Sequence, residues 1–558
     1  MSVADRLRLN LSVAEAVLVE EGAEGLQHEQ GRAGVRLDVR VGLDNVVWCD
    51  CCTHPLARYT DRNLPRFAVS QRSMSRIRTL LLTSLSGLVL GALVASPAMA
   101  SHSQALFFEA PRDLVAVSPA TQAKTLAQLQ ALGVKALRVE LAWGDVAPGE
   151  HSTKKPNFDA TNPTSYNWSA YDELLFAAKR LNWPVLLTVT SPVPEWATAG
   201  HDDKQLVTRP DDKDFKEFMT AVARHYAGMV SLYAIWNEPN HPQFLQPQFN
   251  SKGKPESPRI YRGLFQAGYE GLRAAGIAQP KMLMGETAPV GYDTLSRSEI
   301  RKEGANALLH PVAPLAFLRE ALCLNSKYRK AGTCGMLPVY GYSHHAYTVG
   351  SPYYRPKQPD DVTIGVLSRL SGALDRAEAA HAIPRHVPIY LTEFGIQSKP
   401  SILGVSTAKQ AEYDAIAEKI AWSNSRVAAF SQYLLRDDPL GGLPGSGVHG
   451  GTIGFQTGLE TVNGARKPLY YGFPVPLVVA KQGHGFSLWG LVRPSAGATK
   501  LKITVEPKGS KTYRTLKVVQ TNSLGYWSLK SSVQGSRWRV SWRSPSGIAY
   551  NGPPIGAN

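Results

Sequence analysis

The stretch "YAIWNEPNH", residues 233–241, runs from a hydrophobic segment straight into polar residues. The residues from Tyr233 to Trp236 have the apolar and aromatic character of a buried strand. Pro239 cannot continue strand pairing because it lacks an amide hydrogen. Asn237 and Glu238 therefore stand where a buried strand ends. In an α/β barrel this is the end at which reactive groups gather, so both residues are candidates for chemistry.

Seven further apolar runs alternate with amphipathic segments between residues 101 and 473. They are "QALFFEA", "VKALRVELAW", "WPVLLTVT", "KMLMGETAP", "VYGYSHHAYT", "VPIYLTEFG" and "AAFSQYLLRDD". Near-continuous apolar strands are typical of a parallel sheet buried on both faces. Eight such strands predict a (β/α)8 TIM barrel, an α/β fold, with an open doubly wound sheet as the alternative. No glycine-rich phosphate-binding motif follows the first strand, which disfavours a nucleotide-binding version of that alternative.

Residues 74–100, "MSRIRTLLLTSLSGLVLGALVASPAMA", have the three parts of a secretory signal peptide. A positive start precedes the apolar stretch from Leu80 to Val94, and Ala98 to Ala100 form a small-x-small cleavage site. The segment is too short and too rich in small residues at its end for a stable membrane span. We therefore expect a secreted chain that begins at Ser101, without a membrane span after cleavage.

A signal peptide belongs at an N-terminus, so Met74 is the predicted start and residues 1–73 a probable misassigned upstream extension. The alternative is a cytoplasmic extension with a metal-binding cysteine cluster at residues 49–52, "CDCC". That cluster lacks the paired spacing of a zinc site. The other two cysteines, Cys323 and Cys334, are expected to form a disulfide in an exported chain, and a free buried pair is the alternative.

Residues 474–558 have a different pattern, with short alternating strands separated by Gly, Ser, Pro and Asn turns. This pattern predicts a small C-terminal β-sandwich. The segment holds 12 basic residues and one acidic residue, Glu506, so it carries +11 of the net charge of +16. Two interpretations remain open: a solvated brace for the barrel, or a surface for anionic cell-surface polymers. Nucleic acid is not an expected partner of an exported chain.

Two glutamates end strands that lie on roughly opposite sides of the predicted barrel mouth. Glu238 ends the fourth strand and Glu393 ends the seventh. Carboxylates about 5 Å apart suit retaining glycoside hydrolysis, with one as acid/base and the other as nucleophile. Apolar walls and a neighbouring negative charge raise the pKa of such an acid, and Arg138 on the second strand is placed to keep Glu393 ionised. Arg138 could instead form a core ion pair with Glu140.

The order of these motifs resembles the clan A glycoside hydrolases, a group of retaining (β/α)8-barrel enzymes. "IWNEPN", "LTEFG", "LRVELAW" and "HAY" at 345–347 resemble its motifs on strands four, seven, two and six, and "GLETVNGARKPLYYGF" resembles the barrel's end in family 39-like and family 5-like members. The resemblance implies Glu238 as acid/base and Glu393 as nucleophile. It also implies Asn237 as a ligand of the sugar 2-hydroxyl. His345 and Tyr347 take the places of the strand-six pair, with Tyr347 bonded to the nucleophile.

The sequence departs from the clan pattern at two strand ends. Strand eight reads "SQYLLRDDP", with Asp437 and Asp438 where many members carry a tryptophan, so glucan or xylan specificity does not carry over. Strand three lacks the histidine common in family 5, which favours family 39. Glu286 and Asp437 could bind substrate hydroxyls or be structural. Trp143 and Trp196 could be sugar platforms or barrel packing, and His344 is interpreted as a packing residue.

The sequence thus predicts a secreted, retaining glycoside hydrolase whose substrate is a poly- or oligosaccharide. Two glutamates perform this chemistry without a metal ion or cofactor. The alternative is a non-catalytic carbohydrate-binding protein on a barrel scaffold, because a fold does not by itself imply activity.

Overall fold

The computed structural model describes residues 40–41, 47–48, 104–199, 206–439 and 454–558. The predicted signal peptide and almost all of residues 1–73 lie outside these ranges. The chain divides into two compact units, one of residues 22–96 and one holding the remainder. In the first unit, β1 (Arg40–Val41) pairs with β2 (Val47–Trp48) in antiparallel fashion. All that follows concerns the second unit.

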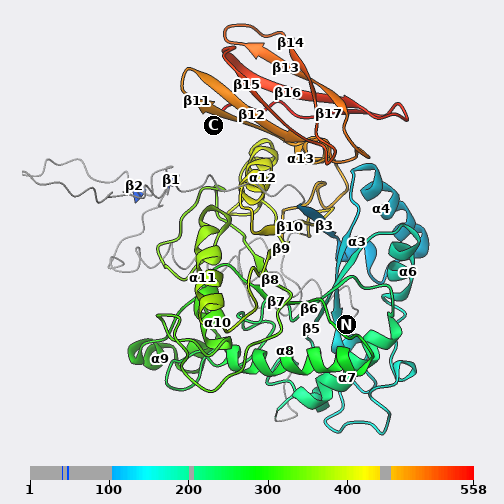
Figure 1. Cartoon of the computed structure of the whole chain (residues 1–558), viewed down its shortest axis with the longest axis vertical. Coiled ribbons are helices and arrows are strands. Elements are labelled where there is room, and N and C mark those ends of the chain that lie inside the picture. Colours follow the sequence, from blue (N-terminus) through cyan, green and yellow to red (C-terminus); the bar gives the residue numbers. More distant parts are fainter. Residues whose placement is uncertain (1–39, 42–46, 49–103, 200–205, 440–453) are drawn as a thin grey trace, which may run out of the picture. The chain divides into compact units, whose positions relative to one another are not determined.

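Eight strands close a barrel in the order β10-β3-β4-β5-β6-β7-β8-β9, and every neighbouring pair is parallel (Figure 1). The strands are β3 (Ala105–Glu109), β4 (Leu137–Ala142), β5 (Val185–Thr190), β6 (Leu232–Ile235), β7 (Met282–Thr287), β8 (Gly341–His345), β9 (Ile389–Glu393) and β10 (Val427–Tyr433). Each corresponds to one of the eight apolar runs. The predicted TIM barrel is confirmed.

Helices follow the strands and cover the outside of the barrel (Figure 1). They are α3 (Pro111–Leu114), α4 (Pro119–Ala131), α5 (Trp143–Val146), α6 (Asp172–Arg180), α7 (Asp212–His225), α8 (Ser257–Ala274), α9 (Arg297–Glu303), α10 (Pro314–Ala321), α11 (Ser368–Ala379), α12 (Thr407–Trp422) and α13 (Pro468–Gly472). The start of α4 shows how local chemistry sets these bounds. The Ser118 hydroxyl accepts from the Thr121 amide, and Pro119 occupies the first turn.

The barrel strands alternate between two environments. On β4, Leu137, Val139 and Leu141 pack into the main core with the helices. On the interior, a separate apolar layer forms from Phe107, Ala136, Leu186, Leu232, Ala234, Leu283, Tyr390 and Ala429. Arg138 follows Ala136 by two residues, and Glu109 follows Phe107 by two. The polar groups of the site therefore also point into the barrel, and they lie next to this apolar layer, toward the C-terminal ends of the strands.

The C-terminal residues form two antiparallel sheets, β11-β12-β15 and β14-β13-β16-β17. Their strands are β11 (Leu477–Gln482), β12 (Gly485–Leu491), β13 (Lys500–Pro507), β14 (Arg514–Gln520), β15 (Tyr526–Ser531), β16 (Gly535–Arg543) and β17 (Ala549–Asn551). A core that includes Trp527 and Trp538 joins the two sheets. The all-β C-terminal domain is as predicted.

Candidate active site

Arg138 lies at the centre of the site, with a side chain that has no exposed surface. Its guanidinium contacts four carboxylates and one amide oxygen: Glu109, Glu140 (3.0 Å), Glu286 (2.8 Å), Glu393 (3.3 Å) and Asn237 (2.9 Å). Burial lowers the pKa of Arg138, but the surrounding carboxylates outweigh burial and hold this pKa well above its usual value. The arginine therefore stays charged and binds the ends of five strands together.

The end of β6 explains the opening motif. Trp236 and Glu238 have positive φ angles of 68° and 35°, which are uncommon for residues with a side chain. Hydrogen bonds hold this backbone: the Asn237 amide donates to Thr190 Oγ1 at 3.1 Å and the Glu238 amide to the Glu286 carbonyl at 3.0 Å. Strand pairing stops here, and the turn aims both side chains into the site.

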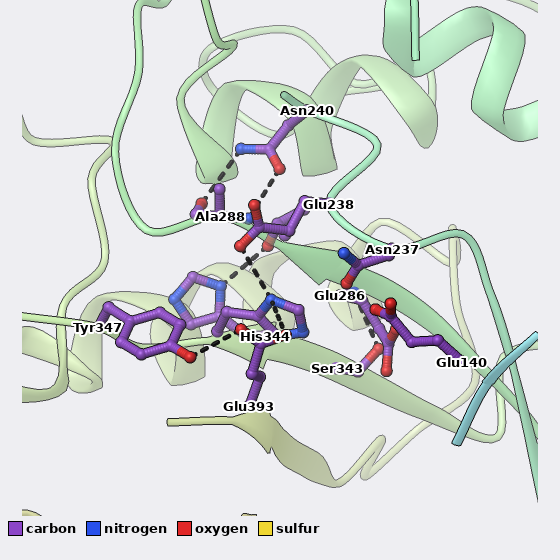
Figure 2. A network of polar contacts seen from close by, with 12 residues as sticks. Glu140, Asn237, Glu238, Asn240, Glu286, Ala288, Ser343, His344, Tyr347 and Glu393 are labelled. Atoms are coloured by element: carbon purple, nitrogen blue, oxygen red, sulfur yellow. Dashed lines mark hydrogen bonds and ion pairs between the residues drawn. The ribbon is translucent and has the colours of Figure 1, made fainter. Parts of the chain in front are cut away.

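Asn240 fixes the position of this turn. Its amide oxygen accepts from the Ala288 amide at 2.8 Å, and its Nδ2 donates to the carbonyls of Ala288 (3.1 Å) and Val312 (2.8 Å) (Figure 2). Asn240 is fully buried. The loops after β6 and β7 are thereby joined directly behind Glu238.

His345 connects the two glutamates. Its Nδ1 lies 2.9 Å from Glu238 Oε1 and 3.5 Å from Glu393 Oε2. These two oxygens are therefore at most 6.4 Å apart, the sum of the two distances. Burial, followed by the positive charge of Arg138, lowers the pKa of His345 well below its usual value, so the imidazole is neutral. A neutral ring with its proton on Nδ1 donates to the carboxylates.

Tyr347 holds the second glutamate. Its hydroxyl donates to Glu393 Oε1 at 2.7 Å (Figure 2), while Arg138 contacts Oε2 of the same carboxylate. Burial raises the pKa of Glu393 to about 7, and Arg138 and Tyr347 act in the opposite direction. Burial and then the charge of Glu393 raise the pKa of Glu238 well above its usual value. Glu238 thus keeps its proton, while Arg138 and Tyr347 offset part of the effect of burial on Glu393.

Side-chain exposure separates the groups that can reach a substrate from those that hold the site. Glu238 and Glu140 keep 11% of their side-chain surface and Glu393 keeps 7%, whereas Arg138, Glu286 and His345 keep none. Of the two interpretations of Glu286, the structural one therefore fits the structure, and Arg138 and His345 likewise position the other residues of the site. Asn237 points its amide oxygen at Arg138, which leaves its Nδ2 as a donor beside the glutamates.

The two tryptophans are packing residues, and the sugar-platform interpretation is wrong for both. Trp143 has no exposed surface and stacks on Phe218 with ring centroids 5.3 Å apart. Trp196 is 4% exposed, meets Trp143 edge to face and donates its indole proton to the Pro148 carbonyl. Neither ring presents a face that a sugar could stack on.

Asp437 and His344 also have structural partners. The Asp437 carboxylate accepts from Lys467 Nζ at 2.7 Å and from the Gly458 amide at 2.9 Å, which fits the structural one of its two interpretations. His344 contacts Thr287 Oγ1 and the Val362 carbonyl and packs as expected. The structure joins Cys323 and Cys334 by a disulfide.

Sequence reasoning missed Glu109 and Asn240. Glu109 ends β3 and contacts Arg138, so the strand-end argument that selected Glu238 and Glu393 applied to it equally. Burial raises the pKa of both Glu109 and Glu140. Across the described ranges, no group of three or more His, Cys, Asp or Glu is arranged to hold a metal ion. In the same ranges, no helix combines the length and apolar character that crossing a membrane requires.

Comparisons with solved structures give matches of low identity. A family 39 glycoside hydrolase from Bacteroides cellulosilyticus WH2 is 15% identical, with a TM-score of 0.44, over 77% of this chain and 80% of the other. A glucosidase from Croceicoccus marinus is 11% identical, with a TM-score of 0.44, over 78% and 95%. A β-glucuronidase from Bacteroides uniformis is 10% identical, with a TM-score of 0.38, over 82% and 46%. No curated protein matches the chain.

The family comparison is more extensive. The model of the cellulase family, glycosyl hydrolase family 5, matches residues 99–428, more than half of the 558 residues. The match holds although β5 lacks the histidine whose absence favoured family 39. The chain therefore belongs to glycosyl hydrolase family 5, and it is a clan A glycoside hydrolase on a TIM barrel.

Proposed function

We propose that this glycoside hydrolase works by double displacement with retention of anomeric configuration, with Glu238 as acid/base and Glu393 as nucleophile. The observation that carries the proposal is the shared contact with His345, which limits the facing oxygens of the two carboxylates to 6.4 Å. Retaining glycosidases have carboxyl groups about 5–5.5 Å apart, whereas inverting enzymes need about 6.5–9.5 Å to admit a water molecule.

The roles follow from the partners of each carboxylate. Glu393 Oε attacks the anomeric carbon while Glu238 transfers its proton to the departing glycosidic oxygen. Glu238, now a carboxylate, then removes a proton from water, which attacks the anomeric carbon and releases the sugar from Glu393. Tyr347 and Arg138 stabilise the Glu393 carboxylate before attack and after release.

Asn237 is the residue we assign to the sugar 2-hydroxyl. Its oxygen is held by Arg138, so the amide is oriented with Nδ2 free to donate to a substrate oxygen. A hydrogen bond to the 2-hydroxyl strengthens as the oxocarbenium-like transition state forms. The substrate class that this proposal names is a poly- or oligosaccharide with O-glycosidic bonds.

The stereochemistry of the product and the dependence of activity on the leaving group test the assignment. Once a panel of glycans and aryl glycosides has identified a substrate, NMR should show that the first product keeps the anomeric configuration. Glu393→Gln should abolish turnover, and Glu238→Gln should lose most activity on poor leaving groups but retain activity on a dinitrophenyl glycoside. The same substitution at exposed Glu173 on α6 is the control. Wild-type turnover in both catalytic variants would show that the assignment is wrong, and binding without turnover by the native chain would favour the non-catalytic alternative.

We also propose that the enzyme is secreted. The first barrel strand begins at Ala105 and the family match at residue 99, directly beside the predicted cleavage site after Ala100. N-terminal peptide mapping in the expressing organism should find Ser101 as the first residue of the mature chain. An intact peptide from residues 1–73 would contradict the predicted start at Met74. The anionic cell-surface partner of the basic C-terminal domain stays a prediction.

A further inference from the structure

The basic residues of the C-terminal domain are not evenly distributed, because five of them share one sheet face. We call this the outer face: the solvent side of the four-stranded sheet, with Lys500, Lys502, Arg537, Arg539 and Arg543, all exposed. The alternation of the strands creates it. On β13, Leu501, Ile503 and Val505 face the core, and on β16, Trp538, Val540 and Trp542 do so. The intervening positions therefore point to solvent.

The pairing of β13 with β16 places these cations beside one another. Lys502 pairs with Ser541, Thr504 with Arg539, and Glu506 with Arg537. Neighbouring strands lie about 4.8 Å apart, and side chains on one face repeat about every 7 Å along a strand. The outer face is therefore a flat array of five positive groups with Glu506 as the one carboxylate on the same face.

The three-stranded sheet of the domain, β11-β12-β15, packs against the barrel. Val478, Trp489, Leu491 and Tyr526 from β11, β12 and β15 pack against Ala415 and Ile416 of α12. Arg493 donates to both carboxylate oxygens of Glu418 on α12, at 2.9 and 3.1 Å. The three-stranded sheet thus packs on α12, whereas the outer face belongs to the four-stranded sheet, which meets the barrel at its edge strand β17, where the Tyr550 hydroxyl donates to the Ala131 carbonyl.

Within the described ranges, no ion pair joins a cation of the outer face to a carboxylate, although Glu506 on β13 lies opposite Arg537 on β16. Among the described residues, the ion pair that involves a C-terminal Lys or Arg is Arg493 with Glu418. Arg539 lies over the Tyr513 ring at 4.2 Å, and Arg543 donates to the Gly547 carbonyl. Like charges on neighbouring strands destabilise a sheet. A bound polyanion would remove that repulsion.

We propose that the outer face binds an acidic polysaccharide. Arginine and lysine recognise carboxylates through charge-assisted hydrogen bonds, and a flat array of cations suits an extended polymer with repeated negative groups. A polysaccharide is favoured over nucleic acid because the same chain carries a glycoside hydrolase barrel. The proposal rests on that activity and not on the assigned roles of Glu238 and Glu393.

The test is equilibrium binding of the full chain to polygalacturonate, with dextran as the neutral polymer and a DNA duplex as the competing polyanion. The variant removes four charges: Lys500→Gln, Lys502→Gln, Arg539→Gln and Arg543→Gln. A matched control removes four exposed charges from the barrel helices: Lys124→Gln, Lys179→Gln, Arg180→Gln and Lys213→Gln. Both variants lower the net charge equally, so a comparison of the two distinguishes binding by the outer face from attraction to the overall charge of the protein.

We expect the dissociation constant for polygalacturonate to rise about tenfold or more in the outer-face variant and to change by less than about twofold in the control. Binding should weaken with salt, and dextran should not bind. The outer-face variant should unfold at the same or a higher temperature, because it loses like-charge repulsion, so lost binding cannot be attributed to unfolding. Hydrolysis of a small aryl glycoside should be unchanged in both variants. Equal loss in both variants, tighter binding to the duplex, or no binding by the native chain would each overturn the proposal.

Discussion

Replacing Tyr347 by Phe isolates one hydrogen bond to the proposed nucleophile. The Tyr347 hydroxyl donates to Glu393 Oε1 at 2.7 Å inside a buried site, and its ring packs against Phe394 and Phe455. Phenylalanine keeps the shape of the ring and removes only the donor. The substitution therefore destabilises the ionised state of Glu393 and leaves the packing of the site unchanged.

The structure gives the sign and the size of the effect. The hydrogen bond stabilises the carboxylate, so it lowers the pKa of Glu393, which burial raises to about 7. A hydrogen bond to a charged group contributes about 1.5–3 kcal/mol, and 1.36 kcal/mol corresponds to one pKa unit. Tyr347→Phe should therefore raise this pKa by about 1–2 units. Glu393 would then be protonated, and inactive as a nucleophile, at neutral pH.

The pH dependence of kcat/KM is the appropriate assay, because its acid limb reports the essential base of the free enzyme. In the native enzyme we expect this limb near pH 7, and in Tyr347→Phe about 1–2 units higher, with activity recovered on the alkaline side. Tyr342→Phe is the control, since Tyr342 lies on β8, the strand that ends two residues before Tyr347, is also buried, and contacts Thr287 instead of a glutamate. An unmoved limb in Tyr347→Phe, or an equal shift in Tyr342→Phe, would refute the reasoning.

Three further predictions concern the charge and packing of the site. Arg138→Met should lower the free energy of unfolding by about 3–5 kcal/mol in a denaturant titration, because several buried carboxylates lose their cation; a change below about 1 kcal/mol would contradict this. Trp143→Ala should cost about 3–5 kcal/mol of stability and leave KM unchanged, whereas a raised KM at full stability would restore the sugar-platform interpretation. An aryl glucuronide should be hydrolysed about 100-fold or more slowly than the matching glucoside, because a uronate would face Glu140 and Glu393 at short range. Glu140→Gln should reduce this difference in rate. Equal rates of hydrolysis for the two substrates would contradict the prediction.

The strands of the barrel could be predicted because their signal is local. Each is a short apolar run between amphipathic segments, and all eight runs became strands. Two C-terminal strands lack the alternating pattern for local reasons: β17 has only three residues, and β11 begins with a continuous apolar run.

The site was harder to predict because it depends on departures from regular strands. Glu286 reaches Arg138 at a register shift between Gly285 and Thr287, where its own φ angle is 50°. No period of two residues predicts that direction. The sugar-platform interpretation of Trp143 and Trp196 was wrong for another reason. A position near the end of a strand does not determine whether an aromatic ring faces the site or the core. Motif order therefore selected the two glutamates and did not separate positioning residues from substrate contacts.

The charges of the two functional regions bear on the substrate. At the mouth of the barrel, Glu140 and Glu393 keep exposed side-chain surface beside Glu238, so we expect a negatively charged sugar to be repelled from the position between Glu238 and Glu393. The outer face of the C-terminal domain has the reverse sign and would attract such a polymer. If both expectations hold, the enzyme would not degrade the acidic polymer that its outer face binds. Neutral glycan lying within an acidic matrix meets both conditions, since the matrix would hold the enzyme while the neutral chains enter the barrel.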